Sequence, residues 1–108
     1  MNRWEVWSFD FPGAGAHPAI LISHPDRVAR SRFVNVLLCS TQRATRTANE
    51  TEVLLDEADG FDWPTLCKCD LFYLVPREKL YQRRGIVSWE RRRTVLQRII
   101  SSCAFNAP

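Results

Sequence analysis

Two short polar segments of this chain carry side chains that can move a proton or hold a phosphate. His17 stands directly before Pro18, and residues 40–43 read Ser-Thr-Gln-Arg after a long apolar run. An imidazole titrates near neutral pH and serves as acid or base, and a guanidinium binds phosphate. The ordinary interpretations remain open, because a histidine beside a proline is common on surfaces and Ser-Thr often caps its own backbone.

Other groups that could hold a metal or form a triad are weaker candidates. Cys67 and Cys69 lack a second ligand pair at zinc spacing, so we expect them to pack as small interior residues. His24 and Asp26 are too isolated to indicate a catalytic triad. We therefore expect neither a metal nor another cofactor.

The strands that must position His17 come first in the chain. Trp4–Phe11 alternates in a way that predicts a strand with an aromatic face, which we expect to belong to the core. Pro12 and Gly13 predict a tight reversal into a second strand at Ala19–Ile22, with His17 at the rim of the hairpin. Phe33–Cys39 is the strongest strand signal, apolar enough to be buried on both faces, and it leads directly to Ser40.

The remaining elements complete a small α+β domain. We expect a turn or a short helical turn near Pro25, strands at Thr51–Asp56 and Thr65–Val75 with a bulge or a twist near Asp70, and a connection over residues 76–84. Ser88 is typical of a helix N-cap, and the final amphipathic helix runs to about Cys103. Its predicted packed side is Val95, Leu96, Ile99, Ile100 and Cys103. This order predicts a strongly bent antiparallel barrel with a C-terminal helix, as one domain over residues 1–108.

Charge is distributed unevenly along the chain. Residues 27–46 contain five arginines, residues 77–98 eight basic side chains, and residues 50–62 six acidic side chains with no basic one. Clustered arginines attract polyanions, although a solvated surface would show the same pattern. No run of 18 apolar residues and no signal peptide is visible, so we expect a cytoplasmic protein with reduced cysteines and no membrane segment.

The order of elements and three sequence motifs resemble the PemK/MazF toxin endoribonucleases of bacterial toxin–antitoxin pairs. The family opens with a strand carrying a Glu-Val-Trp motif, continues with a proline-led apolar strand ending in serine, and has a third strand ending in Ser/Thr and Gln. The matching residues here are Trp4–Trp7, Asp10, Pro12 and Gly13, then Pro18–Ser23, then Val36–Gln42.

The resemblance implies an SH3-like, CcdB/PemK-like barrel and a function. Family members cleave single-stranded RNA selectively and without metal, leaving 2′,3′-cyclic phosphate and 5′-OH ends, and a guanidinium and a Ser/Thr hydroxyl do most of the chemistry. By position, the catalytic residues are His17 and Ser40. The RNA-binding positions implied in the same way are Thr41, Gln42, Arg43, Pro12 and Gly13.

Two departures from the family keep other functions open. His17 replaces the arginine before the proline, and the first loop is shorter than usual. Both changes favour a catalytically weakened relative that binds RNA or an antitoxin. A gyrase poison of the CcdB type is a third possibility, but the ending at residues 104–108 does not resemble that family. The resemblance also implies a homodimer and an antitoxin partner with an acidic disordered tail.

Overall fold

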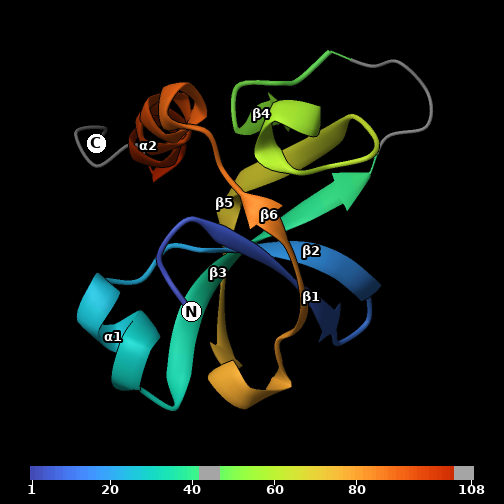
Figure 1. Ribbon diagram of the computed structural model, residues 1–108. Coiled ribbons are helices and arrows are strands. Elements are labelled where there is room, and N and C mark those ends of the chain that lie inside the picture. The colour runs from blue at the N-terminus through green and yellow to red at the C-terminus, as the bar shows by residue number, and fades with distance from the viewer. Residues whose placement is uncertain (42–46, 104–108) are drawn as a thin grey trace.

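The computed structural model describes residues 1–41 and 47–103 (Figure 1). In these residues six strands form one antiparallel sheet in the order β4-β5-β3-β2-β1-β6, which curls into a half-barrel. The α+β prediction is therefore confirmed, with a bent sheet and a C-terminal helix. The strands are β1 Glu5–Phe11, β2 Gly15–Leu21, β3 Phe33–Thr41, β4 Glu52–Leu55, β5 Thr65–Pro76 and β6 Tyr81–Ile86. The helices are α1 Pro25–Arg30, α2 Trp89–Cys103 and the single-turn 3₁₀ helices η1 Glu57–Asp59 and η2 Arg77–Lys79.

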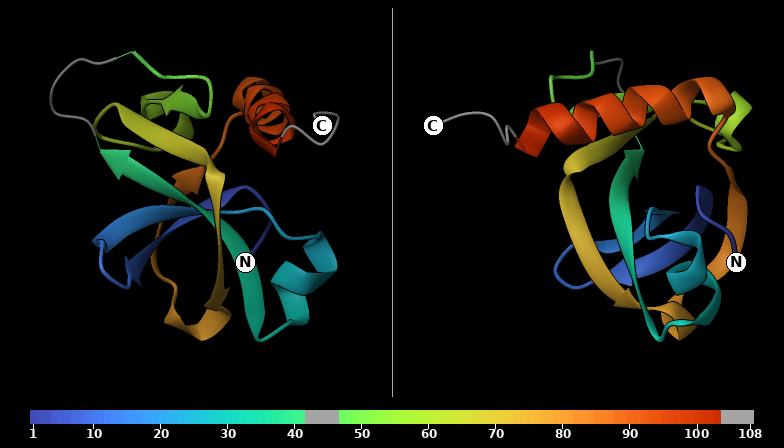
Figure 2. Two further views of the ribbon diagram at one scale, coloured as in Figure 1. Left: turned by 180° about the vertical axis from the view of Figure 1, so that it is seen from behind. Right: turned by 90° about the vertical axis from the view of Figure 1, so that its left-hand side faces the viewer.

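The sheet separates two hydrophobic cores, and the central strand β3 contributes to both. Leu37 and Cys39 belong to the core beneath α2, whose Val95 is fully buried there. Val36 and Leu38, which alternate with them along the strand, belong to the second core. That core also contains Val28 of α1 and Phe9 and Phe11 of β1. Figure 2 shows α2 crossing one end of the half-barrel while α1 lies toward the other. The double burial predicted for Phe33–Cys39 is thus confirmed for β3 from Val34 to Cys39 but not for Phe33, which is exposed, and the core position of the β1 aromatics is confirmed.

A large bulge in β5 lets one strand serve both cores. Leu37 pairs with Phe72 and Cys39 with Cys67, so residues 68–71 stand opposite Leu38 alone. Cys67 just before the bulge and Cys69 within it belong to the α2 core, whereas Tyr73 and Val75 after it join the other core. The bulge expected near Asp70 is confirmed, and it relieves the conflict between the two alternating patterns of this segment.

The sequence interpretation missed β6, which it assigned to a connection. Tyr81–Ile86 pairs with β1 at the edge of the sheet, with Val6 opposite Gly85 and Ser8 opposite Tyr81. The segment has no apolar alternation because most of its side chains are exposed. Charged residues on an edge strand discourage pairing with other chains, which explains a strand of this composition.

The packed face of α2 also differs from the prediction. Val95 and Ile99 contact the core, but Leu96 and Ile100 are 46% and 63% exposed and Cys103 is exposed. The apolar residues of α2 therefore form two stripes. The stripe with Val95 and Ile99 faces the core on the side where α2 meets β4 and β5, whereas the stripe with Leu96 and Ile100 faces solvent. Ser88 precedes the helix as predicted, and its carbonyl accepts a hydrogen bond of 3.0 Å from the Arg92 amide.

Candidate functional site

The turn between β1 and β2 is fixed by backbone geometry. The Ala14 amide donates to the Phe11 carbonyl at 3.0 Å, and Phe11 pairs with Gly15. Gly13 and Gly15 have φ angles of 79° and 86°, in the left-handed region that favours glycine. Pro12 and Gly13, predicted to contact RNA, are exposed at the tip of this turn.

His17 lies half-buried on β2, just past that turn, and its tautomer is set by the backbone. Its Nε2 lies 3.0 Å from the Ala14 carbonyl oxygen. A carbonyl only accepts, so Nε2 carries the proton and donates it to this bond. In the neutral ring Nδ1 is therefore the basic nitrogen, and no described residue forms a hydrogen bond with it.

Aromatic side chains support the His17 ring from the core side. Its centroid lies 6.4 Å from that of Phe11, and Phe11 packs edge-on against Tyr73 at 4.9 Å. Phe11 is 2% exposed, so this contact anchors the imidazole to the interior while the ring stays half-buried at the surface. Sequence reasoning did not connect Tyr73 with the site, because the β5 bulge decides which core the Tyr73 side chain joins.

Ser40 lies near the end of β3, the strand that pairs with β2. The last β2–β3 pairs are Leu21 with Val36, Ile20 with Leu37 and Ala19 with Leu38. The same register, if continued by two residues beyond this ladder, would set His17 opposite Ser40, on the face that carries Ala19 and Leu38 into the core. Pro18 has no amide hydrogen, which explains why the ladder stops before this point. Ser40 is half-buried at the rim.

The other predicted site residues follow Ser40 along the chain. Thr41 is the last residue of β3, where it pairs with Thr65. Gln42 and Arg43 lie outside the described residues. His17, Ser40 and Thr41 thus occupy neighbouring strand ends, and Pro12 and Gly13 belong to the turn that His17 contacts.

Asp10, one of the family-like residues, has a structural partner. The Tyr81 hydroxyl donates to the Asp10 carboxylate at 2.8 Å, and this bond raises the pKa of Tyr81. The contact joins β6 to the end of β1 beside the turn. Asp10 therefore steadies the hairpin through the strand that the sequence did not predict.

A second contact fastens the same two strands nearer the start of β1. Burial raises the pKa of Glu5, but hydrogen bonds from Trp7, Asn2 and Arg83 outweigh it and leave the pKa lowered. Trp7 Nε1 donates to Glu5 at 3.0 Å, and Arg83 lies 3.2 Å from the other carboxylate oxygen. The indole of Trp7 is thereby held in the sheet and is not presented as a stacking platform.

Cys67 and Cys69 pack in the interior, as predicted, whereas Cys103 is exposed. Cys67 and Cys69 are fully buried with their sulfur atoms 3.9 Å apart. A hydrogen bond with Cys39 and burial raise the pKa of Cys67 well above the ordinary thiol range. A thiol held protonated in this way is a poor nucleophile. Within residues 1–41 and 47–103, no cluster of His, Cys, Asp or Glu has a geometry that could hold a metal ion.

No helix in the described parts of the chain has the length and apolar character needed to cross a membrane.

His24, the second histidine, accepts a hydrogen bond of 3.1 Å from the Asp26 amide and caps α1. The hydrogen bond of His24 is therefore local to the start of α1.

Solved structures with this fold include an endoribonuclease in complex with its cognate antitoxin from a mycobacterial species. It has a TM-score of 0.84 and 19% identity and covers 100% of this chain and 99% of that chain. The Mycobacterium tuberculosis toxin MazF-mt6 has a TM-score of 0.79 and 18% identity, covering 92% and 95%. A chain of the MazE–MazF structure from Deinococcus radiodurans has a TM-score of 0.75 and 14% identity, covering 96% and 95%.

Identities this low establish the shared fold alone, and comparison with curated proteins gave no match. Family membership comes from the sequence model of the PemK-like, MazF-like toxins of type II toxin–antitoxin systems, which matches residues 2–103. Since the match spans nearly the whole chain, this protein belongs to the PemK-like, MazF-like toxin family.

Proposed function

We propose that this toxin is a metal-independent, sequence-selective endoribonuclease that cleaves single-stranded RNA. The observation that carries the proposal is the imidazole of fixed tautomer at His17, on a strand whose neighbour β3 ends with Ser40 and Thr41. Structures of similar fold that are described as endoribonucleases support the same assignment. The test is cleavage of single-stranded RNA by the purified protein in the presence of EDTA, with identification of the product ends.

The proposed reaction is an attack of the 2′-oxygen on the adjacent phosphorus, with loss of the 5′-oxygen. Nδ1 of His17 accepts the proton of the 2′-hydroxyl, since Nε2 already donates its own proton to Ala14. The Ala14 carbonyl then stabilises the imidazolium. The Ser40 hydroxyl donates to a phosphate oxygen as charge builds there. The 5′-oxygen takes a proton from solvent, which leaves a 2′,3′-cyclic phosphate and a 5′-OH.

The residues that flank this pair are proposed to bind the RNA strand. Pro12 and Gly13 form an exposed, rigid turn beside His17. Thr41, Gln42 and Arg43 continue directly from Ser40, and the guanidinium of Arg43 is assigned to a phosphate.

A non-catalytic binding module is the second candidate function. The observation that favours it is His17 itself, which stands where the family carries an arginine. An imidazole lacks the permanent charge and the five donors of a guanidinium, so phosphate binding by this position is weaker. In this alternative the barrel would bind RNA or an antitoxin without cleaving RNA.

The protein is also proposed to act as a homodimer that pairs through α2. Trp89, Leu96 and Ile100 lie on one stripe of the helix and are 80%, 46% and 63% exposed. Together with Trp4 they border a groove of about 690 Å³ that also contains Glu90 and Arg93. Apolar area of this kind is characteristic of an interface, and opposite charges in one groove suit a self-complementary contact.

Light scattering on size-exclusion fractions should therefore give about twice the chain mass of 12.5 kDa. Leu96→Asp and Ile100→Asp should each shift the protein to the monomer, because a carboxylate buried against apolar surface is unfavourable. Arg98→Asp, on the opposite side of α2, is the matched control and should stay dimeric. A wild-type monomer at micromolar concentration would contradict the assignment.

The proposed protein partner is an antitoxin with an acidic, disordered tail. Two of the similar structures are described as toxin–antitoxin complexes. Clustered arginines in residues 27–46 and 77–98 match such a tail in charge.

A further inference from the structure

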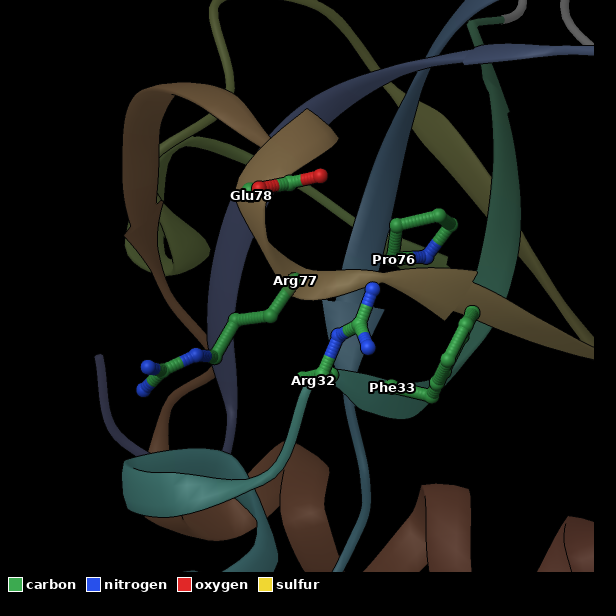
Figure 3. Close-up of a pocket in the computed structure, with 5 residues that line it drawn as sticks. All are labelled: Arg32, Phe33, Pro76, Arg77 and Glu78. Atoms are coloured by element: carbon green, nitrogen blue, oxygen red, sulfur yellow. The ribbon is translucent and has the colours of Figure 1, made fainter.

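A second concave site lies at the opposite end of β3 from the candidate catalytic pair. Its cavity of about 250 Å³ is lined by Arg32, Phe33, Pro76, Arg77 and Glu78 (Figure 3). Phe33 begins β3 and Ser40 follows seven residues later, which corresponds to about 23 Å of strand. The cavity is therefore separate from the site around His17 and Ser40.

Phe33 presents an aromatic ring to solvent where the sequence predicted a buried side chain. The ring is 43% exposed, and the guanidinium carbon of Arg32 lies 6.0 Å from its centroid. Figure 3 shows the Arg32 guanidinium beside Pro76, next to the Phe33 side chain. A flat apolar surface and a cation thus occur together in one hollow, and this combination suits the base and the phosphate of a nucleotide.

The two arginines of the cavity have different roles. Arg77 extends away from Phe33 toward α1, where it donates to the carbonyls of Val28 and Ala29 at 3.1 and 2.6 Å. Its amide also donates to the Arg32 carbonyl at 2.7 Å, which fixes the backbone of the cavity. Arg32 forms no ion pair with any acidic side chain in the described part of the chain. Arg77 therefore maintains the shape, and Arg32 has a guanidinium available for a ligand.

The surroundings of the cavity carry an excess of positive charge. Residues 26–33 and 76–79 together contain five basic side chains and two acidic ones. Arg27, Arg30 and Lys79 are exposed there. A local cationic field attracts phosphate and strengthens the case for a nucleic-acid ligand over an apolar one.

We propose that this cavity binds one nucleotide of single-stranded RNA, with its base stacked on Phe33 and its phosphate on Arg32. The inference rests on the proposed ribonuclease function, because it concerns RNA that also reaches His17 and Ser40. The two sites are about 23 Å apart along β3. Only a strand of several nucleotides occupies both, and such a strand gains affinity from the linked contacts.

The test measures RNA binding by fluorescence anisotropy in a Ser40→Ala background, so that the RNA remains uncut. The probes are labelled oligouridines of about 16 and about 4 nucleotides, which bracket common single-strand site sizes. Phe33→Ala should weaken binding of the long probe by about tenfold, a normal loss for one stacked base. Arg32→Ala should weaken it and reduce the salt slope of log K by about 0.7, the value for one phosphate contact.

Matched controls separate this site from a general loss of charge or apolar surface. Arg98→Ala removes an exposed arginine of α2, away from the cavity, and Leu74→Ala removes a side chain of β5 that is 63% exposed. Both should bind the long probe as the parent does. Thermal unfolding checks that each variant folds, and Phe33→Leu replaces Phe33→Ala if the latter does not, because leucine keeps an apolar side chain without the aromatic ring.

The outcomes distinguish this inference from the proposed function. If the parent binds the long probe and Phe33 and Arg32 variants bind like the controls, the nucleotide site is wrong and the ribonuclease assignment stands. If the parent binds neither probe, the proposed function fails and the nucleotide site fails with it. A tenfold loss confined to the cavity variants and the long probe supports the site.

Discussion

Replacing His17 by alanine is expected to lower the rate of RNA cleavage by on the order of 10²-fold or more, a normal loss for one acid–base group. Ser40→Ala should cause a loss of similar size, because it removes a donor to the charge that develops on the phosphate. Single-turnover cleavage of a labelled single-stranded RNA measures both effects. His24→Ala is the matched control, since His24 caps α1 and should leave the rate unchanged.

The same assay decides between an enzyme and a binding module through His17→Arg, which restores the family residue. A gain in rate would identify the natural protein as an attenuated nuclease. Wild-type protein and His17→Arg that are both inert would overturn the enzymatic assignment and leave the binding module.

The pH dependence of the rate reports which form of the imidazole acts. If Nδ1 takes the proton of the 2′-hydroxyl, the neutral ring is the active form, and the rate should rise with pH as the ring loses its proton. The His17→Arg variant should lose this dependence, because arginine stays protonated. A rate that falls as the pH rises would assign the imidazolium, as a partner for the phosphate charge.

Asp59→Ala is expected to cause a large loss of stability, about 3 kcal/mol in the free energy of unfolding. Asp59 is fully buried, and its carboxylate accepts from the Ser88 amide at 2.9 Å and the Asp56 amide at 3.1 Å. Alanine leaves both amides without their partner and releases the start of α2 from the η1 turn. Urea denaturation measures the change.

Asp62→Ala is the matched control for that prediction, because Asp62 is exposed three residues further along. Its midpoint should stay close to that of the wild-type protein. A loss below about 1 kcal/mol for Asp59→Ala would mean that water or a rearranged turn replaces the carboxylate. Because α2 carries the exposed stripe of Trp89, Leu96 and Ile100, the variant should also weaken the proposed dimer.

Local sequence patterns were enough to predict the elements that bury apolar side chains. The double burial of β3 could be read from its apolar run, which only Asn35 interrupts, and the β5 bulge from the conflict between its two alternating halves. β6 could not be predicted in this way, because most of its side chains are exposed. Its sequence therefore lacks the alternation of apolar and polar residues that marks a half-buried strand. The same limit applies to α2, where a solvent-facing stripe and a core-facing stripe look alike in sequence.

The candidate site was predictable in its residues but not in its geometry. The resemblance pointed to His17 and Ser40 by position. Their alignment depends on the β2–β3 register, and a connection that contains α1 separates those strands, so no short turn fixes it. The bond from His17 to the Ala14 carbonyl depends on the exact turn closed by Ala14 and Phe11. The exposure of Phe33 likewise depends on its place at the end of the sheet.

The ends of the RNA fragments that the wild-type protein produces distinguish the proposed reaction from other routes of cleavage. Purified protein is incubated with single-stranded RNA in EDTA, and the products are identified by mass spectrometry. We expect cleavage to persist and to leave 2′,3′-cyclic phosphate and 5′-OH ends, because attack by the 2′-oxygen uses only side chains of the protein. Products with 5′-phosphate ends, or cleavage that EDTA abolishes, would contradict the roles given to His17 and Ser40.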